Sequence, residues 1–194
     1  MWNSWGLKGA VAGVAIAMVA VGGPAQAGSY GDTYSAAQLF PAVSETRLGV
    51  MGTNLEDGAY VEGPVVINGE ILFGRFSPDY SDRWKQFLLN PRVHLGVSYN
   101  PHENGMSEGY AGLTWDLKLT DILFFEASFG GTIHDGPDIS YGCSPLFRES
   151  ASLGVELTSR LRLLATVDHA SHAGLCGEQN KGLTNAGLRL GYKW

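Results

Sequence analysis

A histidine and a serine two positions apart, His169 and Ser171, are the residues of this chain best suited by type and spacing to do chemistry. The positions that alternate with them toward the N-terminus are all apolar: Leu161, Leu163, Ala165 and Val167. Because side chains in a β-strand alternate between two faces, these apolar residues share one face with His169 and Ser171. A base and a hydroxyl at the end of an apolar face suit nucleophilic attack on an apolar substrate. The alternative interpretation is a solvated strand end on which two polar residues coincide.

The first 27 residues have the features of a secretory signal peptide. A single lysine precedes an apolar run, and a small-x-small pattern predicts cleavage after Ala27. The apolar run is short for a bilayer span, although a retained membrane anchor is the alternative. Residues 28–43 are small and polar and are expected to form a periplasmic lead-in. Residues 44–194 then remain as one folded domain.

The composition narrows the classes of partner and cofactor. Only 16% of residues are charged, which is low for a soluble domain, and aromatic residues make up 11%. The net charge of −6 and the lack of a basic block argue against nucleic acid as a partner. The two cysteines, Cys143 and Cys176, predict one disulfide in an exported chain. No Cys or His pair has ligand spacing with two further ligands nearby, so a metal site is not expected.

Apolar and polar residues alternate through eight segments of the domain, and this period of two predicts eight β-strands. The segments are 46–51, 65–73, 93–99, 111–119, 123–132, 150–157, 161–172 and 186–194. One face of these strands is apolar and aromatic. The other face is small and polar and carries the charged residues Glu70, Asp116, Lys118, Glu126, Glu156, Arg162, Asp168 and Arg189.

This division of residues predicts an all-β fold, an eight-stranded antiparallel outer-membrane β-barrel. Charges of both signs can pair inside a narrow barrel while the apolar face meets lipid. The aromatic Trp194 at the end of an alternating strand is typical of such barrels. A lipocalin-like soluble barrel, with the apolar face inward, is the alternative fold. The interior charges and the small strand number argue against an open pore.

The connections predict the orientation of the barrel. Turns near Thr120 and Thr158 are short, as periplasmic turns are. The outer loops are then the segments 56–62, 101–108, 135–145 and 174–181. The connection from Gly74 to Arg92 is long for a periplasmic one, and its apolar and basic residues between 83 and 89 predict a short interfacial helix. In this orientation the His–Ser pair lies near the outer rim and faces lipid.

The residues around the His–Ser pair resemble a known family. The stretch from His169 to Leu175, followed by Asn180–Leu183 and a last strand with an aromatic end, is similar to the lipid A 3-O-deacylase (PagL) family. Residues 147–152 and 182–185 resemble the branch often labelled acyloxyacyl hydrolase. The resemblance is good over roughly residues 92–194.

The resemblance implies an eight-stranded outer-membrane barrel that is a serine esterase. It would remove an ester-linked acyl chain, expected at the 3-O position, from the lipid A of lipopolysaccharide in the outer leaflet, without a cofactor. The family's base and nucleophile correspond to His169 and Ser171. A homodimer is kept open as the oligomeric state. The competing class is a non-catalytic structural barrel, a degenerate relative of the family.

Two positions depart from the family pattern. The family has Asn after the serine, where this chain has His172. The family also has a Glu, the third member of the triad, on the last strand, where this chain has Thr184. A hydroxyl cannot stabilise an imidazolium as a carboxylate does.

Strand geometry offers Glu149 as the third member. If the short turn pairs Leu157 with Leu161, the same register sets Glu149 directly opposite His169 and brings Cys143 close to Cys176. Glu149→Gln is then expected to lower deacylation by orders of magnitude. Thr184→Ala should cost little, whereas Thr184→Glu would raise the rate.

The expected mechanism assigns the remaining residues. His169 takes the proton of Ser171, which attacks the ester carbonyl. The backbone amides of Ala173 and Gly174, or the side chain of Asn180, are candidates to bind the oxyanion, and Thr184 is a further candidate for a supporting role. The other acidic residues near the site suit the third role less well. Asp168 points into the barrel, and Glu178 lies in a loop.

Overall fold

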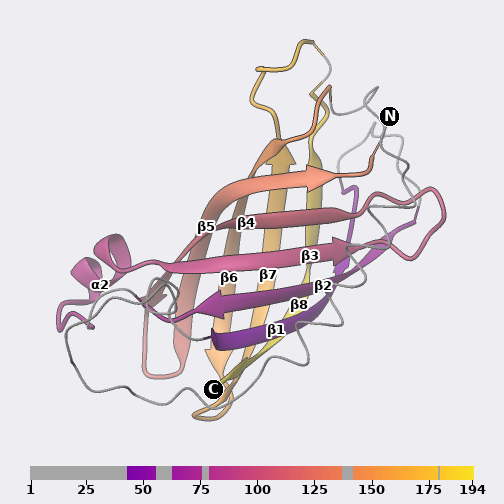
Figure 1. The fold of residues 1–194 in the computed structure, drawn as a ribbon. Coiled ribbons are helices and arrows are strands. Elements are labelled where there is room, and N and C mark those ends of the chain that lie inside the picture. The colour runs from indigo at the N-terminus through magenta and orange to yellow at the C-terminus, as the bar shows by residue number, and fades with distance from the viewer. Residues whose placement is uncertain (1–42, 56–62, 76–78, 137–141, 179) are drawn as a thin grey trace, which may run out of the picture.

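The computed structural model describes residues 43–55, 63–75, 79–136, 142–178 and 180–194, and it is a closed antiparallel barrel (Figure 1). The eight strands are β1 (Val43–Gly52), β2 (Val65–Phe73), β3 (Arg92–Tyr99), β4 (Glu108–Lys118), β5 (Leu123–His134), β6 (Leu146–Glu156), β7 (Leu161–Ser171) and β8 (Leu183–Lys193). Each strand pairs with the next in chain order, and β1 pairs with β8 to close the sheet. The predicted eight-stranded barrel is confirmed. The predicted signal peptide, nearly all of the lead-in and the loop at 56–62 lie outside the described residues.

The barrel has its apolar residues outside and its charges inside. Large apolar side chains are exposed on the outer face, among them Leu48, Val50, Leu113, Phe129, Leu153 and Leu188. Charged side chains are buried within, among them Glu45, Arg47, Glu70, Glu126, Arg148, Asp168 and Arg189. A soluble barrel has the opposite arrangement, so the lipocalin-like alternative is excluded. Of the residues predicted to face inward, Lys118 is exposed at the end of β4.

Arg47 on β1 is the centre of the interior ion-pair network. Its guanidinium lies 2.6 Å from Glu45 Oε1, 3.0 Å from Glu70 Oε1 and 2.6 Å from Glu126 Oε2. Arg189 reaches the second oxygen of Glu70 at 3.0 Å. Side chains from β1, β2, β5 and β8 therefore meet through charge-assisted hydrogen bonds in the barrel interior.

The two ends of the barrel differ in their connections. At one end, called here the short-turn end, the hydroxyls of Thr120 and Thr158 close tight turns by accepting from the backbone amides two and three residues later. The opposite end, the long-loop end, carries the connections after β1, β3, β5 and β7.

The short-turn end also carries α2 (Arg83–Leu89), which lies between β2 and β3. Asp82 caps this helix by accepting from the amides of Trp84 and Lys85. The helix predicted in this connection is therefore present (Figure 1). No helix in the described part of the chain is long and apolar enough to cross a membrane.

Removing Arg47 tests the interior network. Arg47→Ala leaves three buried carboxylates without their common partner, and breaking a buried pair in this way costs about 3–5 kcal/mol. We expect the folded, fast-migrating band on unheated gels to convert to the unfolded band at a clearly lower temperature than in the wild type. Arg160→Ala, which removes only an exposed hydrogen bond to Tyr192, is the control. Equal transition temperatures for the Arg47 variant and the wild type would contradict this role.

Candidate active site

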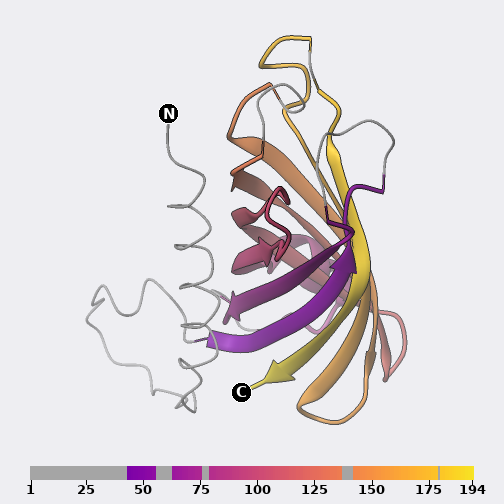
Figure 2. The ribbon, with the colours of Figure 1, turned by 90° about the vertical axis from the view of Figure 1, so that its right-hand side faces the viewer.

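β7 carries His169 and Ser171 on its outer face at the long-loop end. Both side chains are half-buried, and Val167, two residues earlier on the same face, is exposed. In two perpendicular views the connection from β7 to β8 stands above this end of the barrel (Figures 1 and 2). The pair therefore lies where the apolar outer face meets the long loops, as predicted.

The strand register sets the neighbours of the pair. His169 lies opposite Glu149 on β6 and opposite Thr184 on β8. Ser171 lies opposite Phe147. The predicted register of β6 and β7 is thus confirmed, because Glu149 and His169 are directly paired.

The imidazole of His169 is held from the β8 side. Its Nδ1 lies 2.9 Å from the hydroxyl oxygen of Thr184. Gly182, which has a φ of +67°, leaves room for the ring, since a Cβ there would stand 2.5 Å from Cε1 and 3.0 Å from Nε2 of His169. The hydrogen bond favours Thr184 as the residue that orients the ring. Sequence reasoning noticed Gly182 only within the family resemblance, and the bond to Thr184 was not predicted.

Glu149 occupies the opposite flank of His169. Its side chain is exposed and makes no hydrogen bond or ion pair with any residue that the structure describes. The carboxylate is therefore near the imidazole but is not its hydrogen-bond partner in this arrangement. A catalytic role for Glu149 stays a prediction.

The inner faces of the same three strands are joined by a polar cluster. Asp168 accepts from Arg148 Nη2 at 2.8 Å and from Asn185 Nδ2 at 2.8 Å. These residues are the chain neighbours of His169, Glu149 and Thr184. The cluster fixes β6, β7 and β8 relative to one another, and so it positions the residues on their outer faces. Asp168 points into the barrel, as predicted.

A small apolar cluster adds to this support. Met106, Leu146, Ala170 and Leu183 pack together at the long-loop end, each at most 3% exposed. Ala170 separates His169 from Ser171 in the chain, and Leu183 precedes Thr184. Close packing at these positions limits the movement of β7 and β8 beneath the site.

The connection from β7 to β8 is folded by its own hydrogen bonds. The amide of His172 donates to Asn180 Oδ1 at 3.1 Å, and the amide of Cys176 donates to His172 Nδ1 at 3.2 Å. His172, which stands where the family has Asn, is buried and organises this loop. Because the amide oxygen of Asn180 is engaged, its Nδ2 is the group left to donate to a substrate. Ala173 and Gly174, which follow His172 in this loop, have positive φ values of 52° and 80°.

A disulfide links the connection from β5 to β6 with the connection from β7 to β8. Cys143 and Cys176 are bonded, with a Cα–Cα distance of 5.8 Å, and this confirms the predicted pairing. The bond ties the loop above Ser171 to the neighbouring loop. Among the described residues, no group of three or more His, Cys, Asp or Glu side chains is arranged to hold a metal ion.

Comparison with known proteins gives the family of the chain. A family model described as lipid A 3-O-deacylase (PagL) matches residues 72–193, which is more than half of the sequence. The chain belongs to this family. It is therefore a member of a group of outer-membrane deacylases, and its barrel is embedded in a membrane. A comparison with curated protein sequences found no match.

Solved structures with the same fold include other outer-membrane barrels. The crystal structure of the outer membrane enzyme PagL has 15% sequence identity and a TM-score of 0.57, over 78% of this chain and 100% of that one. A de novo designed transmembrane β-barrel has 13% identity and a TM-score of 0.51, over 79% and 97%. The N-terminal barrel of Pseudomonas aeruginosa OprF has 13% identity and a TM-score of 0.50, over 78% and 98%.

The disulfide should restrain the loop between β7 and β8. In a double variant, Cys143→Ser with Cys176→Ser, we expect limited trypsin digestion of the folded barrel to cleave after Lys181 much faster than in the oxidised wild type. Reduced wild-type protein is the matched control and should behave like the variant. Cleavage at the same slow rate in all three proteins would mean that the loop's own hydrogen bonds suffice.

Proposed function

We propose that this protein is an outer-membrane serine esterase that removes an ester-linked acyl chain from lipid A, with the 3-O position as the expected ester. The observation that carries the proposal is the placement of His169 and Ser171 on the lipid-facing side of β7, with the imidazole held by Thr184. The family match supports the same reaction.

The proposed mechanism begins with the tautomer of His169. When Nδ1 donates its hydrogen to the Thr184 hydroxyl, Nε2 is unprotonated and is the basic nitrogen of the ring. Nε2 takes the proton of Ser171 as the serine oxygen attacks the ester carbonyl. The imidazolium then protonates the leaving sugar oxygen. Water hydrolyses the resulting acyl-enzyme by the same steps and returns Ser171 to its free form.

The developing oxyanion needs donors near Ser171. Asn180 Nδ2 is the strongest candidate, because the hydrogen bond from His172 to Oδ1 orients the amide group. The backbone amides of Ala173 and Gly174 are the further candidates. One such donor contributes roughly 10²–10³ in kcat in other enzymes. The substrate reaches Ser171 by lateral diffusion in the leaflet.

We propose that two residues share the work of the missing triad carboxylate. Thr184 orients the ring through its 2.9 Å hydrogen bond to Nδ1. Glu149, directly opposite His169 on β6, supplies negative charge when the imidazolium forms. Neither residue does both tasks, in contrast to a triad Asp or Glu that accepts from the ring and carries the charge.

Replacing the nucleophile tests the function. Lipid A from cells that express the wild-type protein is expected to lose one ester-linked acyl chain, as measured by mass spectrometry, relative to cells with the empty vector. Ser171→Ala should abolish this mass change while the barrel still folds and reaches the outer membrane. Identical lipid A from wild-type and Ser171→Ala cells would favour the non-catalytic structural barrel.

Variants of Thr184 and Glu149 test whether these two residues share the task of the missing triad carboxylate. The sequence alone predicted little cost for loss of the Thr184 hydroxyl, but its hydrogen bond to Nδ1 revises that expectation, and Thr184→Val should lower kcat about 10–100-fold. Thr184→Ser should keep the wild-type rate, because serine retains a hydroxyl for Nδ1. Glu149→Gln should lower kcat by a similar factor, because it removes the negative charge that stabilises the imidazolium. If Glu149→Gln retains full activity at every pH, the orienting bond to Thr184 is sufficient and Glu149 has no part in the reaction.

A further inference from the structure

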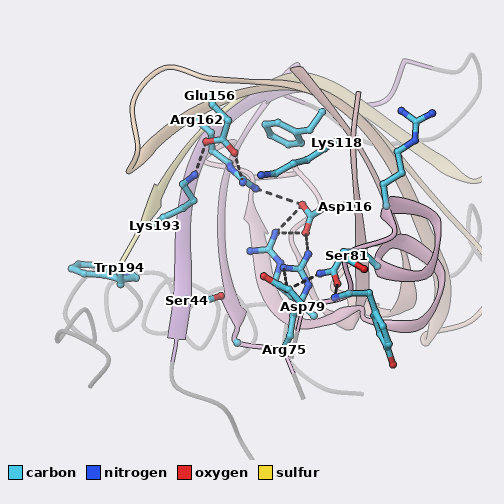
Figure 3. Close-up of a pocket in the computed structure, with 16 residues that line it drawn as sticks. Ser44, Arg75, Asp79, Ser81, Asp116, Lys118, Glu156, Arg162, Lys193 and Trp194 are labelled. Atoms are coloured by element: carbon cyan, nitrogen blue, oxygen red, sulfur yellow. Dashed lines mark hydrogen bonds and ion pairs between the residues drawn. The ribbon is translucent and has the colours of Figure 1, made fainter. Parts of the chain in front are cut away.

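A cavity of about 490 Å³ opens at the short-turn end of the barrel, on the side opposite the candidate active site (Figure 3). It lies beneath the connection between β2 and β3. Periplasmic turns of membrane barrels are normally short, so this long connection is an exception that the fold itself does not require. Its residues Asp79, Ser81 and Gln86 line the cavity, whereas the apolar Leu88 and Leu89 of α2 are exposed elsewhere.

Hydrogen bonds attach the connection between β2 and β3 to the end of the barrel. Arg75 donates to Asp116 on β4 at 2.9 Å and to the backbone oxygen of Asn90 at 3.0 Å. Within the connection, Gln86 donates to Asp79 at 2.8 Å and accepts from the amide of Tyr80 at 2.9 Å. The wall of the cavity is therefore held in place by the protein before any ligand arrives.

The lining of the cavity has an excess of positive charge. Six basic side chains line it, Arg75, Arg83, Arg92, Lys118, Arg162 and Lys193, against three acidic ones, Asp79, Asp116 and Glu156. The excess of three falls to one when Glu45 and Glu126 are counted, since both pair with Arg92, and it returns to two when Arg47, which pairs with both glutamates, is added. The carboxylates of the barrel thus do not neutralise the basic side chains that line the cavity.

Several donors in this wall have no acceptor. The Nε groups of Arg92 and Arg162 are buried and make no hydrogen bond, although the outer nitrogens of both guanidinium groups are paired. Lys118 makes no ion pair with any described residue, and its side chain extends toward the space between Asp116 and Arg162 (Figure 3). Because solvent does not reach these two Nε atoms, an anion in the cavity would meet Arg92 and Arg162 through the charge of their guanidinium groups, and Lys118 is the donor that can reach it directly.

We propose that this cavity binds a small phosphate-type anion from the periplasmic side of the membrane. Guanidinium and ammonium groups are the donors that recognise phosphate oxygens in proteins. Lys118 supplies the free charge, and the Arg92 and Arg162 guanidinium groups line the wall beside it. The ligand is either a soluble phosphate ester or the phosphate of a lipid headgroup from the inner leaflet.

The test uses the full mature barrel in phosphate-free maltoside micelles with glycerol 3-phosphate as the probe. Calorimetric titration should show saturable binding of one equivalent, and Lys118→Gln should weaken the affinity about tenfold. Lys85→Gln is the matched control, because Lys85 lies on α2 but does not line the cavity, and its affinity should equal that of the wild type. No saturable binding, or an equal loss in the Lys85 variant, would overturn the proposal.

A second titration in phosphatidylcholine nanodiscs distinguishes the two sources of phosphate. If a lipid headgroup is the natural ligand, glycerol 3-phosphate should bind in micelles but be excluded in nanodiscs. If the ligand is soluble, the affinity should be the same in both. Either result supports the site, provided that Lys118→Gln weakens the binding measured in micelles.

Discussion

Backbone hydrogen bonding is the constraint on which this structure depends. Within a bilayer there is no water to satisfy amide and carbonyl groups, so a sheet must close on itself. Pairing of β1 with β8 supplies the last row of bonds. Closure of only eight strands leaves a narrow interior, into which every second residue points. The charges that face inward therefore have to satisfy one another, and the contacts of Arg47 with Glu45, Glu70 and Glu126 are the result.

The same alternation connects the interior to the candidate active site. A residue that faces lipid has two chain neighbours that face inward, so ordering one face of a strand orders the other. Asp168, between Arg148 and Asn185, fixes three strands from the inside. His169, next to Asp168 in the chain, receives its position from this cluster and its ring orientation from Thr184. The backbone beneath the site is thus ordered from inside the barrel, and its position does not depend on partners supplied by the lipid.

Much of the fold, and part of the site, could be predicted from the sequence. A period of two identifies strands, and a short turn fixes the register of the strands that it joins, which is why the pairing of Glu149 with His169 and the disulfide of Cys143 with Cys176 were foreseen. The other neighbour of His169 could not be found in this way. β7 and β8 are joined by a long loop, so no turn rule predicts the register in which they pair. The hydrogen bond between His169 and Thr184 depends on that register. The ion-pair partners of Arg47 likewise could not be predicted from the sequence, because several carboxylates face the same small space inside the barrel.

In the proposed reaction, the location of the substrate in the membrane explains how a Ser–His pair without the usual triad carboxylate could still hydrolyse an ester. Lipid A is a component of the leaflet, so the enzyme would work at saturation, where extra ground-state binding does not raise the rate. Only kcat matters, and loss of a triad carboxylate costs roughly 10⁴ in kcat in serine proteases. A carboxylate about 5 Å from an imidazolium, at an effective dielectric constant of about 20, stabilises it by roughly 3 kcal/mol. That is at most about two powers of ten in rate, and less where water reaches the exposed Glu149. In the proposed mechanism, Glu149 would therefore recover part of the lost rate and Thr184 would preserve the geometry, which together would give a slow esterase.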